Sequence, residues 1–309
     1  MGKVAFLFPG QGSQAVGMGR DLFDHGDDIA QLFHQADAAL GIPLTEWMFQ
    51  GPEDRLRQTE NTQPSLVLTG LAAFRLVTSR TTLRPDFVAG HSLGEYAAIA
   101  AAGGFSPMDA IRLVRVRGEA MRAALPPGEG GMAAVLNLDA AEVENVCREA
   151  AEATGQVCAP ANFNTAAQIV ISGHLAAVER AMALAKAKRA RCVMLPVSAP
   201  FHCALMAPAA RTMSEVLSSQ GIADLQVPLV ANVTARETLQ GETIRAQLVA
   251  QVTSPVRWEA SMRRLLELGV DTFVELGTGQ VLTGMLKRIG QEVRAVAVNG
   301  PADLNKLVF

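Results

Sequence analysis

The sequence predicts an α/β fold with a mostly parallel sheet and a smaller unit inserted into it. Residues 4–8 are a short, fully apolar run that stops at a Pro-Gly pair, as expected for a buried parallel strand. Aromatic residues make up only 5% of the chain, and alanine and glycine are abundant instead. Alanine-rich helices can pack close to a sheet, so the composition also favours an α/β protein.

The first elements of the chain alternate between strand and helix patterns. Residues 64–80 are apolar enough for a central, nearly buried helix, and residues 86–90 form a second short strand. The alanine-rich residues 93–102 are expected to be helical. Ser106 followed by a proline is typical of a helix start, and the helix that begins there carries Arg117.

A Pro- and Gly-rich linker at residues 125–131 separates these elements from a second set of predicted strands and helices. The expected elements after it are strands at 132–136, 156–163, 168–172 and 191–195 and helices at 139–153 and 175–187. This strand-helix-strand-strand-helix-strand order is ferredoxin-like. We therefore predict a small domain at residues 130–196. The large domain would comprise residues 1–129 and 197–309, with later strands near 229–231 and 272–274.

Composition excludes several classes of function. A net charge of -3 and a pI near 6.0 argue against a protein that coats nucleic acid. The sequence contains no apolar run of roughly 18 residues or more, and its start lacks the pattern of a secretory signal. The four cysteines have no paired CxxC spacing, which predicts neither a disulfide framework nor a zinc site. We expect a globular cytoplasmic protein.

Residues 90–94 read Gly-His-Ser-Leu-Gly and fit the pattern GxSxG between a predicted strand and a predicted helix. Small residues permit a sharp turn that exposes Ser92, and free backbone N–H groups at the helix start can meet a developing oxyanion. The alternative is a serine that merely caps a helix in a tight turn. The strand-turn-helix context favours a nucleophile.

A serine nucleophile needs a base, and the chain has five histidines. His202 follows a Pro-rich stretch where the chain re-enters the large domain, and such a loop favours a role in a site. The alternative is a loop histidine that caps a helix. His91 adjoins Ser92, but adjacent side chains diverge on a tight turn, which favours a packing role. The others are expected on a polar surface region or in the small domain: His25, His34 and His174.

The sequence shows no acidic residue that would clearly orient the base. No acidic residue between Ser92 and His202 stands in a recognisable motif, so a backbone carbonyl or an amide side chain remains. The loop after the first strand nominally matches a dinucleotide fingerprint, but it lacks the acid-ended second strand. We interpret that loop as presenting Gln11 to the serine. Arg117 is either a solvated helix residue or a planar fork for a substrate carboxylate.

Several motifs together resemble one family. They are FPGQGSQ at 8–14, GHSLGEYAA at 90–98, NFN at 162–164, RGEAM at 117–121, PFHCALM at 200–206, SPVRW at 254–258 and ELGTGQVLTG at 275–284. In this combination and order the chain resembles, nearly end to end, the malonyl-CoA:acyl carrier protein transacylases of fatty-acid synthesis.

The resemblance implies an α/β-hydrolase-like large domain with a mostly parallel sheet and an inserted ferredoxin-like small domain. It also implies transfer of a malonyl group from malonyl-CoA to the phosphopantetheine thiol of acyl carrier protein, through a serine ester. No cofactor, metal, nucleic acid or membrane is expected to take part. The expected enzyme is a monomer that supplies malonyl groups for fatty-acid biosynthesis.

The same resemblance implies roles for matched residues. Ser92 would be acylated, with His202 as the base for attack and the acid for the leaving thiol. Gln11 and the backbone N–H of Leu93 would form the oxyanion hole. Arg117 would bind the free carboxylate of the malonyl group.

Three further residues receive roles from the resemblance. Gln251 would orient His202 through its backbone carbonyl, which accounts for the missing acid. Phe201 fits a pattern that accompanies malonyl over methylmalonyl in related polyketide synthase domains, because it adds bulk near the α-carbon. Asn162 would also contact the substrate. Where the family often has a lysine, this chain has Gln280, a change that could alter carrier docking but not the chemistry.

Other functions are compatible with some of these residues. A serine hydrolase such as a thioesterase would need no carboxylate clamp and would release free acid. A non-catalytic acyl-binding protein would require Ser92 and His202 to be incidental. A stand-alone acyltransferase of a polyketide pathway would differ only in its partner. One basic run could dock an acidic carrier or could be a solvated helix face: Arg180, Lys186, Lys188, Arg189 and Arg191.

Overall fold

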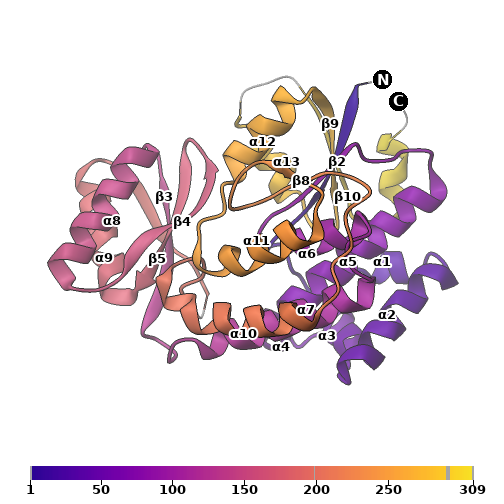
Figure 1. Ribbon diagram of the computed structural model, residues 1–309, viewed down its shortest axis with the longest axis horizontal. Coiled ribbons are helices and arrows are strands. Elements are labelled where there is room, and N and C mark those ends of the chain that lie inside the picture. The colour runs from indigo at the N-terminus through magenta and orange to yellow at the C-terminus, as the bar shows by residue number, and fades with distance from the viewer. Residues whose placement is uncertain (1, 198, 290–292, 308–309) are drawn as a thin grey trace.

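The computed structural model describes residues 2–197, 199–289 and 293–307, and these residues form two sheets (Figure 1). The larger sheet has the strand order β10-β9-β1-β2-β7-β8, and only the β7–β8 pair is antiparallel. Its strands are β1 (Lys3–Phe8), β2 (Phe87–Gly90), β7 (Leu229–Val230), β8 (Glu237–Thr238), β9 (Val270–Leu276) and β10 (Arg294–Val298). The sequence analysis predicted neither β8 nor β10.

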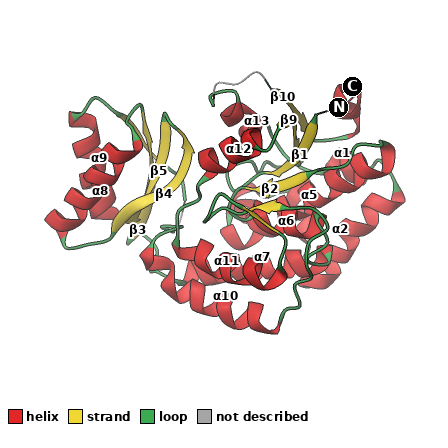
Figure 2. Ribbon diagram, turned by 45° about the horizontal axis from the view of Figure 1, so that its top comes forward, coloured by secondary structure: helices red, strands yellow, loops and turns green. Residues whose placement is uncertain are grey.

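The larger sheet is buried on both faces, as its apolar strands predict. Along β1, Ala5 and Leu7 pack with Trp258 and other residues of the helices on one face. Phe6 and Phe8 point to the opposite face and join the main core. Figure 2 shows helices on either side of these strands.

The helices around the larger sheet are α1 (Arg20–Phe23), α2 (Asp27–Leu40), α3 (Leu44–Gln50), α4 (Glu53–Arg57), α5 (Thr59–Arg80), α6 (Gly94–Ala101), α7 (Pro107–Ala123), α10 (Ala207–Ser219), α11 (Gly241–Thr253), α12 (Trp258–Glu267) and α13 (Val281–Leu286). Three of them, α5, α6 and α7, correspond to helices that the sequence patterns predict. Short 3₁₀ helices span Ala204–Met206 and Pro301–Leu307. None of the helices in the described ranges is long and apolar enough to cross a membrane.

Helix α5 begins earlier than the predicted residue 64, because the helix tolerates Pro64 in its second turn. A proline has no N–H to offer the carbonyl four residues before it. That carbonyl, on Glu60, accepts a hydrogen bond from the Arg115 side chain of α7 at 3.2 Å instead. A tertiary contact therefore satisfies the group that the proline leaves free.

The smaller sheet is antiparallel, with the order β4-β5-β3-β6. Its elements are β3 (Gly130–Leu136), α8 (Ala140–Thr154), β4 (Cys158–Thr165), β5 (Gln168–His174), α9 (Leu175–Ala187) and β6 (Arg191–Met194). This order of strands and helices is ferredoxin-like. On β3, Ala133 and Val135 pack with the two helices, while Met132 and Ala134 join the main core. We propose that residues 130–196 are the small domain and that the rest of the chain is the large one.

The parallel pairing of β1, β2 and β7 gathers three loops at one edge of the sheet. Phe8 and Gly90, the last residues of β1 and β2, are paired in register. The loop that holds Gln11 and the turn that holds Ser92 therefore start side by side. Asn232 follows β7, which pairs with β2 on its other side, so it lies at the same edge. Ligands of open α/β sheets bind at such carboxyl ends.

Candidate active site

Ser92 stands on a sharp turn between β2 and α6, with φ 54°. This left-handed conformation is uncommon for a residue with a side chain, and it is typical of nucleophile elbows. The flanking glycines make the turn possible. A Cβ on Gly90 would lie 2.0 Å from the Gly94 carbonyl carbon, and one on Gly94 would lie 2.2 Å from the Phe8 oxygen. Both glycines of the GxSxG pattern are therefore required by close backbone packing.

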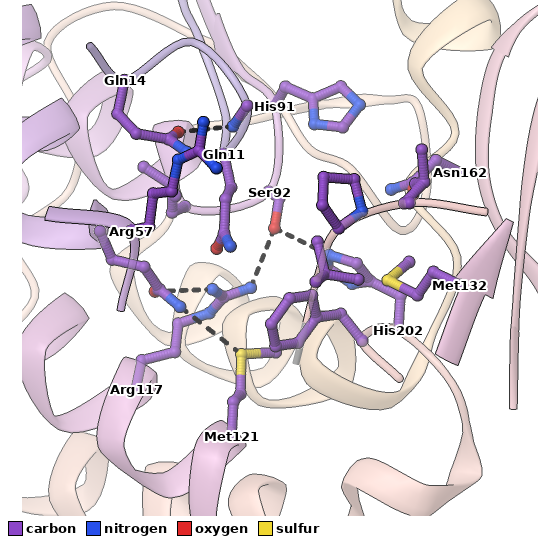
Figure 3. Close-up of a pocket in the computed structure, with 17 residues that line it drawn as sticks. Gln11, Gln14, Arg57, His91, Ser92, Arg117, Met121, Met132, Asn162 and His202 are labelled. Carbon is purple, nitrogen blue, oxygen red and sulfur yellow. Dashed lines mark hydrogen bonds between the residues drawn. The ribbon is translucent and has the colours of Figure 1, made fainter. Parts of the chain in front are cut away.

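Ser92 and His202 meet although 110 residues separate them, as the sequence analysis expected (Figure 3). The Ser92 Oγ and His202 Nε2 atoms are 2.7 Å apart. On the other side of the ring, His202 Nδ1 lies 2.9 Å from the backbone oxygen of Gln251. A carbonyl can only accept, so Nδ1 carries the proton and donates it. Nε2 of the neutral ring is then free to accept the serine proton.

His202 is buried, with 4% of its surface exposed, and this environment keeps the ring neutral. Burial lowers the pKa of His202 to about 3, and the nearby positive charge of Arg117 adds to the effect. At neutral pH the imidazole is therefore in the form that can accept a proton.

This environment predicts the pH dependence of acylation. We expect kcat/KM to stay nearly constant from about pH 8 down to about pH 5, because the base of the free enzyme remains unprotonated over that range. A histidine with the ordinary pKa of 6.5 would lose most of its base form by the lower limit. The measurement is the rate of CoA release at low malonyl-CoA across that range. An acid limb centred near pH 6.5 would contradict the description of His202.

Arg117 is buried on α7, which excludes the alternative of a solvated helix arginine. Its NH2 group donates to Ser92 Oγ at 3.1 Å and to the Gln251 side-chain oxygen at 2.9 Å. Its NH1 group donates to Gln63 Oε1 at 2.8 Å. In the described part of the chain, no carboxylate forms a salt bridge with this guanidinium. A buried cation held only by neutral groups beside a nucleophile is well suited to an anionic ligand.

A cavity of about 350 Å³ opens beside Ser92, between the loops of the larger sheet and the smaller sheet. Figure 3 shows Ser92, Arg117 and His202 around it, with Asn162 and Met132 on the side of the smaller sheet. Phe201 also lines the cavity. Asn162 and Phe201, the two residues expected to contact the acyl group, therefore lie at the cavity wall, and their contacts with substrate stay a prediction.

Two backbone amides at the cavity are free to bind an oxyanion. Gln11 and Leu93 both line it, and neither backbone N–H donates to another of the described residues. The Gln11 side chain is held in place by Thr59, whose Oγ1 donates to Gln11 Oε1 at 2.8 Å. These positions match the oxyanion-hole expectation, whose catalytic role stays a prediction.

Several residues of the site were missed by the sequence analysis. Asn232 accepts from the Ser92 backbone N–H at 2.8 Å through Oδ1, and its Nδ2 donates to the Gly90 carbonyl at 2.7 Å. It follows directly after a predicted strand, and that position was the available signal. Glu95 and Gln63 had no such signal.

His91 has the packing role that its place beside the nucleophile predicted. Its Nε2 lies 2.9 Å from Asn164 Oδ1, and its ring is 5.3 Å from that of Trp258. Burial lowers the pKa of His91. Of the other histidines, His25 and His34 are exposed, as expected.

A serine on a strand-turn-helix elbow, bonded to a buried neutral histidine, is the arrangement of α/β enzymes that form acyl-serine esters. Comparison with known proteins places the chain more narrowly. Residues 5–302 match the model of a family described as the acyl transferase domain. The chain belongs to this family.

Several similar proteins are named malonyl CoA-acyl carrier protein transacylase. The chain is 44% identical to the malonyl CoA-acyl carrier protein transacylase of Bacillus subtilis (strain 168), over 97% of this chain and 95% of that protein. The solved structure of a malonyl CoA-acyl carrier protein transacylase from Coxiella burnetii superposes with a TM-score of 0.96 at 38% identity, covering 99% and 96% of the two chains. The predicted fold class is thereby confirmed.

A third relative was solved with a partner. Its structure is described as a type II PKS acyl-carrier protein in complex with its malonyl-transacylase. It superposes with a TM-score of 0.95 at 42% identity and covers 98% of each chain.

Proposed function

We propose that this chain transfers the malonyl group of malonyl-CoA to the phosphopantetheine thiol of an acyl carrier protein, through a malonyl ester on Ser92. The observation that carries the proposal is the buried guanidinium of Arg117, which forms no salt bridge with a described carboxylate and lies within hydrogen-bond distance of Ser92 Oγ. A hydrolase for uncharged esters would have no use for such a group. Five relatives named malonyl CoA-acyl carrier protein transacylase, each 44% identical to this chain, support the same activity.

The first step forms the ester. Ser92 Oγ attacks the thioester carbonyl of malonyl-CoA while its proton passes to His202 Nε2, which is already in contact. The backbone N–H groups of Gln11 and Leu93 stabilise the negative charge that develops on the carbonyl oxygen. When the carbon–sulfur bond breaks, the CoA thiolate leaves and takes the proton from His202.

The second step reverses the roles of the two thiols. The carrier thiol gives its proton to His202 and attacks the malonyl ester, and the Ser92 oxygen leaves with that proton. The product is the malonyl thioester of the carrier, and the enzyme returns to its starting state. Throughout, the Gln251 carbonyl stabilises the protonated ring by accepting from Nδ1.

Arg117 gives the site its preference for an acyl group with a free carboxylate. Gln63 and Gln251 hold the guanidinium from two sides, and its NH2 group also donates to Ser92 Oγ, which keeps the positive charge beside the nucleophile. Phe201 and Asn162 would limit the space around the α-carbon of the acyl group. Nucleophile, base and arginine already contact one another within a single copy of the chain, and we propose that it acts as a monomer.

The proposed acceptor is the carrier protein of fatty-acid biosynthesis. The solved complex of a similar transacylase with a polyketide carrier makes the polyketide carrier the alternative acceptor. The basic run predicted for docking is exposed on α9, on the turn that follows it and at the start of β6, although Lys188 is already paired with Glu142 at 2.6 Å. We retain this run as a proposed docking surface for either carrier.

Steady-state kinetics with both substrates test this proposal. A transfer through an acyl-serine ester predicts parallel double-reciprocal lines when malonyl-CoA is varied at several fixed carrier concentrations. Carriers of the two pathways, assayed side by side, identify the acceptor by their kcat/KM values. Intersecting lines would contradict a transfer in which CoA leaves before the carrier binds, and release of malonate without carrier malonylation would favour a hydrolase.

A further inference from the structure

Glu95 is a buried carboxylate that the reaction steps do not use. It lies in the first turn of α6, three residues after the nucleophile, and only 1% of its surface is exposed. One oxygen accepts from the Asn232 backbone N–H at 2.9 Å, and the other accepts from the Gln251 side-chain amide. None of the described lysine, arginine or histidine side chains forms a salt bridge with it. Burial raises the pKa of Glu95 to about 7.

The contact with Gln251 determines which way that amide faces. Gln251 Nε2 donates both to Glu95 and to the Ser92 carbonyl, the latter at 3.0 Å. Its Oε1 therefore faces Arg117 and accepts from NH2 at 2.9 Å. A flipped amide would place an NH2 group against the guanidinium and an oxygen against the carboxylate. Without Glu95, the flip would be opposed by the Arg117 donor, the Ser92 carbonyl and the more distant Asn232 Oδ1 at 3.5 Å, and none of these groups carries a negative charge.

Glu95 also connects segments that are distant in the sequence. Its contacts reach Asn232, whose side chain bonds both ends of the Ser92 turn, and Gln251, whose backbone oxygen holds His202. Asn232 and Gln251 are themselves fully buried. A single carboxylate thus joins the loop after β7 and the helix α11 to the first turn of α6.

We propose that Glu95 is a positioning residue for carboxylate recognition, which fixes the amide of Gln251 and through it the guanidinium of Arg117. The inference rests on the proposed function, because it takes the malonyl carboxylate as the partner of Arg117. Glu95 does not contact the acyl group. It acts by keeping an acceptor, rather than a donor, against the arginine.

The test compares malonyl-CoA with acetyl-CoA, which has no carboxylate, in the variant Glu95→Gln. Glutamine keeps the volume of the side chain but has a single acceptor oxygen. Either the Asn232 N–H or the Gln251 amide would therefore face an NH2 group in place of an oxygen. We expect kcat/KM for malonyl-CoA to fall about tenfold or more beyond any fall for acetyl-CoA, the effect of one misdirected bond to a charged group. If this variant does not fold, Gln251→Met removes the amide through which Glu95 would act on Arg117. This variant is expected to lower the ratio of the kcat/KM values for malonyl-CoA and acetyl-CoA similarly.

Glu275→Gln is the matched control. Glu275 is fully buried and also accepts from two backbone amides, those of Leu282 at 3.0 Å and Thr283 at 2.8 Å, at the start of α13. Its replacement removes the same kind of interaction away from the cavity. The thermal stability of this variant is expected to fall, while its malonyl-to-acetyl ratio stays that of the wild type.

A double-mutant cycle with Arg117→Ala separates the inference from the proposed function. If Glu95 acts through Arg117, Glu95→Gln changes the malonyl-to-acetyl ratio in the wild type but not in the Arg117→Ala background. Independent effects on the ratio in both backgrounds would overturn the inference alone, as would a ratio unchanged by Glu95→Gln. A ratio unchanged by Arg117→Ala itself would instead overturn the proposed role of the arginine.

Discussion

Replacing Ser92 with alanine is expected to reduce malonyl transfer by about 10⁴-fold or more. The hydroxyl is the atom that would carry the acyl group, and no other described nucleophile contacts His202 Nε2 in its place. A residual rate would have to come from direct attack of the carrier thiol, helped only by binding and by the oxyanion donors. The measurement is the appearance of malonylated carrier under saturating malonyl-CoA.

Ser106→Ala is the control for Ser92→Ala. Ser106 caps α7 by accepting from the Asp109 backbone N–H at 3.1 Å, and it is exposed. Loss of this cap should lower the free energy of unfolding by about 1 kcal/mol and leave transfer intact. If Ser92→Ala kept more than a few per cent of the wild-type rate, the ester intermediate would not lie on the reaction path.

Replacing Arg117 with alanine is expected to change the substrate preference. Transfer of malonyl should fall at least about 100-fold, since charge-assisted hydrogen bonds contribute about 1.5–3 kcal/mol each. Acetyl transfer should fall far less, because an acetyl group offers the guanidinium no partner. The pKa of His202 should also rise towards its ordinary value, because the charge of Arg117 is one of the causes that lower it. The measurement is kcat/KM for both acyl-CoA substrates across pH.

Arg112→Ala provides the comparison on the same helix. Arg112 is half-exposed and pairs with Asp109 at 3.4 Å, and a surface pair of this kind contributes little. Both acyl-CoA substrates should be used as well as by the wild type. Equal losses for malonyl and acetyl in Arg117→Ala would show that the arginine supports the fold of the site rather than recognising a carboxylate.

The nucleophile was predictable because its signal is local. The strand, the turn and the helix around Ser92 lie within a short stretch of chain. The glycines of the turn are required because a Cβ at Gly90 would lie only 2.0 Å from the backbone of Gly94. The ferredoxin-like order was predictable for a related reason, since its strands and helices follow one another along the chain. The resemblance then supplied the roles of Arg117 and Gln251, which no spacing rule contains.

The rest of the site could not be predicted because it depends on contacts across the fold. Glu95 meets Asn232 and Gln251, which lie 137 and 156 residues away. Nothing in the sequence around Glu95 distinguishes it from a surface glutamate in the first turn of a helix. Short strands such as β8, with two residues, carry too few positions for an alternating pattern. Only the packed structure identifies such elements.

The most direct test of the account is the intact mass of the protein after brief mixing with malonyl-CoA, and again after addition of phosphopantetheinylated carrier protein. The account predicts one malonyl adduct, located on Ser92 by peptide mapping, which disappears as the carrier gains the same mass. Absence of the adduct, with free malonate accumulating instead, would contradict acyl transfer through this serine.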